Sequence, residues 1–254
     1  MTTTDSMPTE TILVRPVSGA PLKVPHHVAL IMDGNGRWAR ERNLPRSAGH
    51  KQGAEALRNI LLACPRIGIK HLTVYAFSSE NWQRPQTEIN DLFGLLKFYL
   101  KRELALIQEN GIRLRVIGET NLIPKDLHKI ISDAEQATAS NQGFDFTVCF
   151  SYGARQELAN AARCMANDVF SGKLTPQEIT SDIFETYLYT YPLPAPDLLI
   201  RTGGEKRLSN FLLWQSAYTE LYFTDTLWPD FTETSFLNAC HEFSYRERRY
   251  GVTE

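Results

Sequence analysis

A stretch with two glycines, an aspartate and an arginine, DGNGRW at residues 33–38, directly follows the hydrophobic run at residues 28–32. The run is short enough to be a buried strand, and residues 39–42 suit a short helix. Glycines at such a junction let the backbone turn sharply and approach a ligand closely. The turn also leaves unpaired N–H groups at the positive end of the helix dipole, so it predicts a binding site for phosphate.

Asp33 has an unexpected charge for a simple phosphate turn, because its carboxylate would repel the bound anion. A cation between the carboxylate and the phosphate removes this repulsion, and Mg²⁺ prefers such oxygen ligands. Asp33 therefore indicates Mg²⁺ at this turn. The same residues also fit an ordinary strand-to-helix turn in which Asp33 caps the helix, since glycine-rich turns are common.

Polar side chains also follow two other predicted strands, at residues 71–77 and 197–201. Because the carboxyl ends of parallel strands share one edge of a sheet, the three clusters are expected to converge on one cleft. Converging arginines need a polyanion, and arginine suits bidentate binding of phosphate. Glu220 is a second candidate ligand for Mg²⁺ beside Asp33. The clusters comprise residues 33–38 with Arg46 and His50; Ser78, Asn81, Trp82 and Arg84; and residues 201–207 with Ser209.

Each of these residues taken alone also has an ordinary structural interpretation. An arginine at a strand end is commonly solvated or paired with a carboxylate, and His50 can cap a helix. Trp82 can be a core aromatic residue, and Glu220 can form an ion pair with an arginine. Their gathering at three strand ends is the observation that favours a functional site.

Predicted strands and helices alternate along the chain, which indicates an α/β fold with a parallel sheet covered on both faces. Strand 113–117 alternates enough to lie near a sheet edge. The helix at residues 88–109 is apolar in several directions, so it is either central to the core or borders an apolar cavity. A capping box at residues 175–178 predicts the start of a further helix. The remaining elements are strands 144–150 and 220–223, and helices at 49–64, 124–139, after residue 153, and from 232 or 235 to about 249.

The composition is that of one globular domain rather than a nucleic-acid-binding protein. The chain has 254 residues, with 27 basic and 29 acidic side chains, which argues against broad nucleic-acid binding. Its four cysteines are far apart and in apolar surroundings, as expected of reduced core residues. No apolar run is long enough to span a membrane. Residues 1–23 lack the pattern of a signal peptide and are expected to form a flexible leader, with a catalytic domain at 24–254.

Four segments resemble the signature motifs of the cis-prenyltransferases, the family of bacterial undecaprenyl diphosphate synthases. The resemblance covers about residues 26–250 and preserves the order of the motifs. It implies a single-domain fold with a six-stranded, mainly parallel sheet flanked by helices and an apolar tunnel, usually in a homodimer. The segments are HVALIMDGNGRW at 27–38, YAFSSENWQRP at 75–85, DLLIRTGGE at 197–205 with RLSNFLLWQ at 207–215, and ELYF at 220–223 with WPDF at 228–231.

The resemblance also implies an activity and a set of site residues. The reaction would add isopentenyl diphosphate units to farnesyl diphosphate with cis double bonds, giving undecaprenyl diphosphate for cell-wall (peptidoglycan) synthesis in the cytoplasm, with peripheral contact at the inner face of the membrane. Asp33 would handle Mg²⁺ and diphosphate, Glu220 would lie near Mg²⁺, and Asn81 would assist proton removal. The substrate-binding residues would be Gly34, Asn35, Gly36, Arg37, Trp38, Arg46, His50, Ser78, Ser79, Glu80, Trp82, Arg84, Arg201, Arg207, Leu208 and Ser209.

Two features leave the product length open. Family members usually read Asn-Tyr-Gly-Gly-Arg after the fourth strand, whereas this chain has Ser151 and Ala154 in the first and fourth places. The strand also carries Phe144, Phe146 and Phe150, which are bulky for the wall of a long tunnel. If these rings face the tunnel, the product is expected to be shorter than eleven isoprene units.

Other function classes fit the sequence less well. A non-catalytic partner subunit of the same fold would lack the residues that handle the diphosphates, yet Asp33, the arginines after residue 200 and Glu220 are present. A kinase or nucleotide phosphohydrolase would need a P-loop or a pair of carboxylates to activate water, and neither motif is evident. A trans-acting prenyltransferase would need DDxxD motifs, which do not occur.

Overall fold

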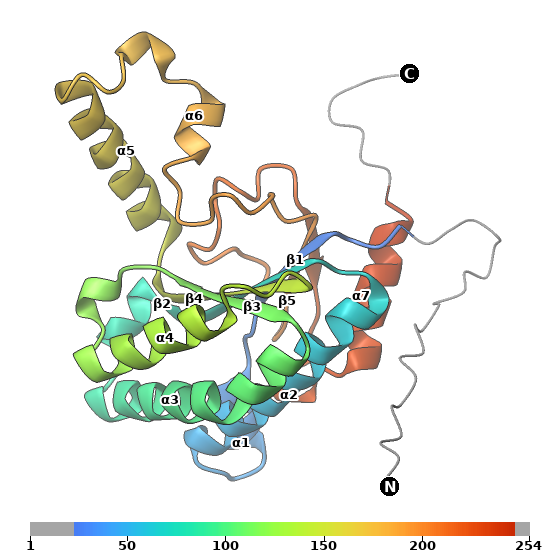
Figure 1. The fold of residues 1–254 in the computed structure, drawn as a ribbon. Coiled ribbons are helices and arrows are strands. Elements are labelled where there is room, and N and C mark those ends of the chain that lie inside the picture. Colours follow the sequence, from blue (N-terminus) through green and yellow to red (C-terminus); the bar gives the residue numbers. More distant parts are fainter. Residues whose placement is uncertain (1–22, 247–254) are drawn as a thin grey trace, which may run out of the picture.

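A six-stranded sheet with the order β3-β4-β2-β1-β5-β6 forms the centre of the molecule (Figure 1). The computed structural model describes residues 23–246, so most of the expected leader and the end of the last predicted helix lie outside the described residues. All five strand pairings are parallel, which confirms the predicted fold class. The strands are β1 (His27–Ile31), β2 (His71–Ser78), β3 (Ile112–Ile117), β4 (Phe144–Tyr152), β5 (Leu198–Arg201) and β6 (Glu220–Phe223).

The helices follow the predicted order, and short 3-10 turns lie between them. Helix α3 covers the apolar stretch predicted at 88–109, and the short helix after the glycine-rich turn is present as α1. The helices are α1 (Asn35–Glu41), α2 (Arg46–Ile67), α3 (Gln86–Glu109), α4 (Lys125–Thr138), α5 (Ala154–Phe170), α6 (Ser181–Glu185) and α7 (Glu233–Ser244). The 3-10 turns are η1 (Ser79–Gln83), η2 (Thr120–Leu122), η3 (Pro176–Glu178) and η4 (Trp228–Asp230).

The sheet is covered differently on its two faces. Alternate residues of the central strands, such as Leu30 and Val74, pack with α2, α3, α4 and α7 in one large core. The opposite face, which includes Leu199, packs against Phe211 and Leu212 of the loop after β5 and the start of α5. The rest of α5 and the short α6 project from the body of the molecule (Figure 1). The long helices therefore gather on one face, and a loop covers much of the other.

Edge and centre strands show the burial expected of their positions. Every residue of β1 is buried, as in a strand with neighbours on both sides and both faces covered. Strand β3 alternates over much of its length between buried and half-buried residues, and among residues 23–246 it pairs with β4 alone, which confirms its predicted place at a sheet edge.

The predicted helix after residue 175 is wrong in extent. The capping box forms, with Glu178 accepting a hydrogen bond from the Thr175 backbone N–H at 2.7 Å, but it begins only the single turn η3. A second capping residue follows at once: Thr180 accepts from the N–H of Ile183 at 3.2 Å and starts α6 instead. The two competing caps divide the segment into two short turns.

The prediction of core cysteines is confirmed for three of the four. Cys64, Cys149 and Cys240 are buried, Cys164 is half-buried, and all four are free thiols. Among residues 23–246, no helix has both the length and the apolar composition needed to cross a bilayer.

Candidate active site

The turn after β1 brings a carboxylate and a glycine to the carboxyl edge of the sheet. Gly34 has a φ of 113°, and a Cβ atom at this position would lie 2.9 Å from the side chain of Leu227, so only glycine fits without strain. The Asn35 side chain donates to the carbonyl of Met32 at 3.1 Å and fixes the turn from within. The predicted strand-to-helix turn is confirmed, with Asp33 at its centre.

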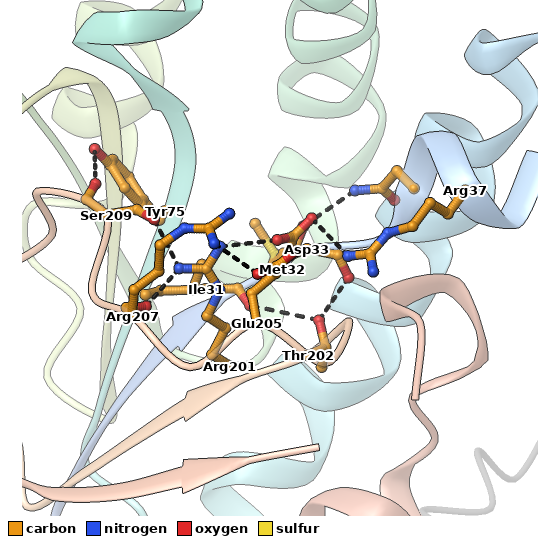
Figure 2. Close-up of polar contacts among 11 residues, drawn as sticks. Ile31, Met32, Asp33, Arg37, Tyr75, Arg201, Thr202, Glu205, Arg207 and Ser209 are labelled. Carbon is orange, nitrogen blue, oxygen red and sulfur yellow. Dashed lines mark hydrogen bonds and ion pairs between the residues drawn. The ribbon is translucent and has the colours of Figure 1, made fainter. Parts of the chain in front are cut away.

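Two arginines hold the Asp33 carboxylate, and Figure 2 shows both pointing toward it. Arg201 at the end of β5 donates from Nη2 to Oδ2 at 2.9 Å, and Arg37 on α1 lies 3.3 Å from Oδ1. The Arg201 side chain is only 4% exposed. Thr202 donates to the Asp33 carbonyl at 2.8 Å, so the ends of β1 and β5 are joined through both side chain and backbone.

Arg201 also fixes the loop that carries Arg207 and Ser209. Its Nη1 donates to Ser209 Oγ at 2.7 Å and to the carbonyl oxygen of Arg207. Ser209 has a φ of 49°, an uncommon value for a residue other than glycine. The guanidinium of Arg201 therefore links the polar cluster after β1, which contains Asp33, to the cluster after β5, which contains Ser209.

The second cluster, on η1, joins the same site. Asn81 accepts a hydrogen bond at Oδ1 from the Ser78 N–H at 3.1 Å, which stabilises the turn after β2. Glu80 Oε1 accepts from Asn210 Nδ2 at 2.9 Å, which ties η1 to the loop after β5. The predicted convergence of the three strand ends is confirmed. One cavity is lined by Asp33, Asn35, His50, Ser78, Glu80, Asn81, Arg84, Arg201, Arg207, Ser209 and Asn210.

Glu88 lies next to the site and was not singled out from the sequence. Its carboxylate binds Arg84 Nη1 at 2.7 Å and lies 3.2 Å from Arg46 Nη1, although it is only 14% exposed itself. The spacing of Arg84 and Glu88, four residues apart at the start of a helix, is a signal for an ion pair. The contact with Arg46 joins α2 to α3, and the spacing of the two residues in the sequence does not predict it.

His50 is neutral at physiological pH. Burial lowers its pKa to about 4, and the positive charges of Arg46 and Arg84 add to this effect. Its Nε2 atom is buried without a hydrogen-bond partner among the described residues, beside the cavity that the ring lines. His50 can therefore donate or accept a hydrogen bond in the cavity, but it does not act as a resident cation.

The cavity has a volume of about 770 Å³ and continues from the charged residues into an apolar region. Helix α3 lines this region, so of the two places predicted for it the structure supports the border of an apolar cavity, although its Phe98 is exposed. Phe146 and Phe150 of β4 also line it, whereas Phe144 is buried outside the lining. Ser151 faces elsewhere and accepts a hydrogen bond from Trp82 Nε1 at 3.0 Å. The apolar lining includes Leu57, Leu61, Leu92, Leu95, Leu96, Leu100, Leu106 and Ile107.

Arg58 and Glu103 are the charged pair in this apolar region. Arg58 Nε donates to Glu103 Oε2 at 2.9 Å, between α2 and α3. The pair continues outward to the surface, because Arg102 bonds both Glu103 and Glu55, and Tyr99 donates to Glu55 at 2.9 Å. A line of ion pairs thus runs from the cavity wall to the surface between α2 and α3.

Several predicted substrate-binding residues are outside the cavity lining. Trp82 packs edge-on against Phe77 and Phe93 of the core, with ring centroids 5.3 and 5.5 Å apart. Trp38 donates from Nε1 to Asp230 at 2.7 Å. The other residues outside the lining are Gly34, Gly36, Arg37, Arg46, Ser79 and Leu208, some of which support lining residues.

The structure does not bring Glu220 to Asp33. Glu220 pairs in register with Leu198 at the start of β5, whereas Asp33 follows Ile31, the partner of Arg201 at its end. Three residues of strand, about 10 Å at the usual rise, separate the level of Glu220 from that of Ile31, and Asp33 lies two residues further along the chain. Glu220 instead accepts from Arg246 at 3.1 Å. The two carboxylates therefore lie apart within a single chain, and their joint binding of one metal ion stays a prediction.

The donor set at Asp33 suits a metal ion that arrives with its substrate. No group of three or more His, Cys, Asp or Glu side chains in residues 23–246 could hold a metal ion. Mg²⁺ usually keeps several waters and binds through one or two carboxylates together with substrate phosphates. A single carboxylate beside two arginines fits that pattern, with Asp33 as the protein ligand.

Comparison with known proteins places this chain in a family. Residues 31–251 match the family model described as "Putative undecaprenyl diphosphate synthase". The chain belongs to this prenyltransferase family. It is 50% identical over 231 residues to an isoprenyl transferase of Rhizobium meliloti (91% of this chain, 94% of the relative). It is 49% identical over 233 residues to one of Geobacter sulfurreducens, covering 92% of this chain and 95% of that protein.

Solved structures of family members share the fold over nearly their whole length. Lavandulyl diphosphate synthase from Lavandula x intermedia, in complex with dimethylallyl diphosphate, superposes with a TM-score of 0.88 at 37% identity, covering 90% of this chain and 99% of that one. A probable undecaprenyl diphosphate synthase from Campylobacter jejuni has a TM-score of 0.76 at 34% identity, covering 91% and 100%. The chain is thus a transferase of the isoprenyl transferase family.

Proposed function

We propose that this transferase adds isopentenyl diphosphate units in succession to farnesyl diphosphate, with cis double bonds, to give undecaprenyl diphosphate. This lipid would serve as the carrier precursor for peptidoglycan. The observation that carries the proposal is the shape of the cavity: arginines and a carboxylate at one end open directly into an apolar region along α3. Such a cavity suits a molecule with an anionic head and a long hydrocarbon tail.

The turn after β1 is proposed to hold the allylic diphosphate. Asp33 would bind Mg²⁺ carried by the diphosphate, and Arg37 and Arg46 would supply positive charge. His50 would donate a hydrogen bond as the neutral ring. The ion pair of Glu88 with Arg46, at 3.2 Å, would hold the guanidinium near Gly36 of the turn before substrate arrives. The glycines at 34 and 36 and the side chain of Asn35 complete the turn.

The loop after β5 is proposed to hold isopentenyl diphosphate. Arg201 and Ser209 already contact one another, and the Arg207 side chain is 61% exposed and able to turn toward an anion. Arginine binds phosphate oxygens in pairs, which fixes the orientation of a diphosphate. Asn81 on η1, with Ser78 beside it, is proposed to assist removal of the proton from the second substrate.

The reaction separates charge, and the residues at the strand ends match this need. As the diphosphate leaves the allylic carbon, negative charge develops near the arginines, which stabilise it. When bound, Mg²⁺ would supply further stabilisation of the leaving diphosphate. The double bond of isopentenyl diphosphate attacks the cationic carbon, and a proton then leaves. Water must be excluded from the cation. Trp82 of η1 packs edge-on against Phe77 of the core, and this contact would hold η1 close to the cavity.

Product length is the part of the proposal with a specific alternative. Phe146 and Phe150 face the cavity, so they limit the space for the growing chain. A shorter cis-prenyl diphosphate is therefore the second candidate product. Incubation of the protein with farnesyl diphosphate, radiolabelled isopentenyl diphosphate and Mg²⁺, followed by chromatography, separates the candidates. A C55 product supports the first, a shorter ladder supports the second, and absence of any prenyl product refutes the proposed function.

We propose that the working form is a homodimer in the cytoplasm, with peripheral membrane contact for its lipid product. The projecting α5–α6 region supports the dimer, because Phe170 is 93% exposed and Ile179 is 44% exposed. Sedimentation of wild-type protein and Phe170→Asp tests it: the wild type should be a dimer and the variant a monomer. Phe98→Asp, at a 53% exposed site on α3, is the control that should stay dimeric. A monomeric wild-type protein would refute this part.

A further inference from the structure

Asn210 is tied to the amino end of α5 by two hydrogen bonds. Its carbonyl oxygen accepts from the N–H of Ala154 at 2.8 Å, and its Oδ1 accepts from the N–H of Arg155 at 2.8 Å. Asn210 has a φ of 64°, in the left-handed region that asparagine tolerates better than most residues. The loop after β5 is thereby anchored to the first turn of a 17-residue helix.

The other end of the Asn210 side chain reaches η1. Nδ2 donates one hydrogen to Glu80 Oε1 at 2.9 Å and the other to Gln156 Oε1 at 3.0 Å, so both amide hydrogens are used. Partial burial alone would raise the pKa of Glu80, but the hydrogen bond from Asn210 and those of nearby groups lower it. Glu80 is therefore a carboxylate at physiological pH, and it binds Asn210 as a charged acceptor.

The neighbours of these two residues in the sequence are site residues. Ser209 precedes Asn210 and binds Arg201 Nη1, and Asn81 follows Glu80. Tyr75 adds support by donating to the Ser209 carbonyl at 3.3 Å. The Asn210–Glu80 bond is thus a direct link between the segment that would hold isopentenyl diphosphate and the segment that would assist its deprotonation.

We propose that Asn210 is a positioning residue that holds the loop at 207–212 and η1 together as one binding unit for isopentenyl diphosphate. This inference rests on the proposed function and adds to it a residue that acts through its neighbours. Without the bond, η1 and the loop can separate, and Ser209 and Asn81 no longer face one bound molecule at the same time. The allylic diphosphate, held by the turn after β1, should be affected much less.

A reversal of the hydrogen bond tests the proposal. Asn210→Asp keeps the acceptor for the Arg155 N–H and tolerates the left-handed backbone, but it places a second carboxylate against Glu80. Loss of a hydrogen bond to a charged group typically changes an equilibrium constant by about tenfold or more. We therefore expect KM for isopentenyl diphosphate to rise about tenfold, whereas KM for farnesyl diphosphate should stay within about twofold of the wild-type value. Adding Glu80→Gln to this variant provides an amide N–H that can donate to the introduced carboxylate, so the double variant should recover most of the loss.

The control is the same substitution at another left-handed asparagine. Asn43 has a φ of 54° and lies exposed in the loop after α1, so Asn43→Asp should leave both KM values unchanged. An unchanged KM for isopentenyl diphosphate in Asn210→Asp overturns the proposal. Equal rises in both KM values, with a lower melting temperature and no recovery in the double variant, also overturn it, because they mark a purely structural role.

Calorimetry separates this inference from the proposed function. Titration of isopentenyl diphosphate into wild-type protein, Asn210→Asp and the double variant measures binding without turnover. We expect wild-type protein to bind isopentenyl diphosphate most tightly, Asn210→Asp most weakly, and the double variant in between. A wild-type protein that binds isopentenyl diphosphate but forms no prenyl product would contradict the proposed function, whereas equal affinities in all three proteins would contradict the role of Asn210.

Discussion

Arg201 donates a hydrogen bond to the carboxylate of Asp33 over 2.9 Å while its own side chain is almost completely buried. A buried guanidinium needs a partner, since leaving its charge unpaired is costly. Asp33 therefore has two tasks in the proposed enzyme: it orients Arg201 before substrate binds, and it would receive Mg²⁺ when the diphosphate arrives. These tasks can be separated by substitution.

Asp33→Asn keeps an oxygen that accepts from Arg201 but removes the negative charge. We expect condensation to fall by about 10²- to 10³-fold, the usual effect of losing one electrostatic contribution to the transition state. The melting temperature should change little. Asp33→Ala should be equally inactive and less stable, because Arg201 loses its partner. Incorporation of radiolabelled isopentenyl diphosphate and thermal unfolding give the two readings, and substantial activity in Asp33→Asn would contradict the assignment.

The phenylalanines of β4 provide a matched pair for product length. Phe146 lines the cavity, and Phe144, two residues earlier on the same strand, is buried outside the lining. We expect Phe146→Leu to shift the products of the proposed reaction toward longer chains by one or more isoprene units, because it enlarges the space for the tail. Phe144→Leu should lower stability by a similar amount without that shift. Chromatography of the radiolabelled products decides, and identical product patterns would exclude Phe146 as a limit.

The Arg58–Glu103 ion pair offers an independent limit in the apolar region. A hydrocarbon chain that covers the pair removes its remaining water, and this desolvation opposes further extension. Replacing both residues with leucine should therefore lengthen the product, whereas exchanging them (Arg58→Glu with Glu103→Arg) should not. If the leucine variant folds and its product length is unchanged, the pair is only a link between α2 and α3.

The buried side chain of His27 should make the protein less stable in mild acid. Burial, with smaller effects from His71 and His26, lowers its pKa from 6.5 to about 4. Between pH 6.5 and pH 4 the unfolded chain therefore binds more protons at His27 than the folded chain does. The free energy of unfolding is highest above pH 6.5 and decreases as the pH falls below it. The loss from this residue approaches about 3 kcal/mol near pH 4.

Urea unfolding at pH 7.0 and pH 5.0 checks this effect. His27→Gln should be less stable at pH 7.0, because the ring hydrogen-bonds Pro194 at 2.7 Å and Thr73 at 2.8 Å. The variant should nevertheless show a smaller difference between the two pH values than the wild type. An equal difference in the two proteins would assign the acid sensitivity to other groups.

The sequence predicted features that depend on local pattern. The predicted strands, such as residues 71–77, alternate with helical segments along the chain, and this alternation predicted a parallel sheet. A parallel sheet in turn predicted that the carboxyl ends of its strands lie at one edge. The excess of leucine and phenylalanine in α3 likewise indicated a second apolar boundary, which is the cavity. These predictions hold because periodicity and strand order are properties of consecutive residues.

Features that depend on the relative level of distant residues could not be predicted. Glu220 is the first residue of the strand predicted at 220–223, but the level of that strand relative to Asp33 is shown only by the register with β5. The Glu88–Arg46 contact and the Asn210–Glu80 bond join residues 42 and 130 positions apart. Sequence spacing carries no information on such pairs, because their geometry is set by how helices and loops pack.

The unequal covering of the sheet has a consequence for how this enzyme can change. The apolar region lies among α2, α3 and one face of the sheet, while the loop proposed to bind isopentenyl diphosphate is anchored on the other face through Phe211 and Leu212. Substitutions that reshape the tail pocket therefore need not disturb the packing that fixes the arginines. Single replacements on the α2–α3 side of the sheet should therefore be able to change the product length, while the residues proposed for the chemical step keep their positions.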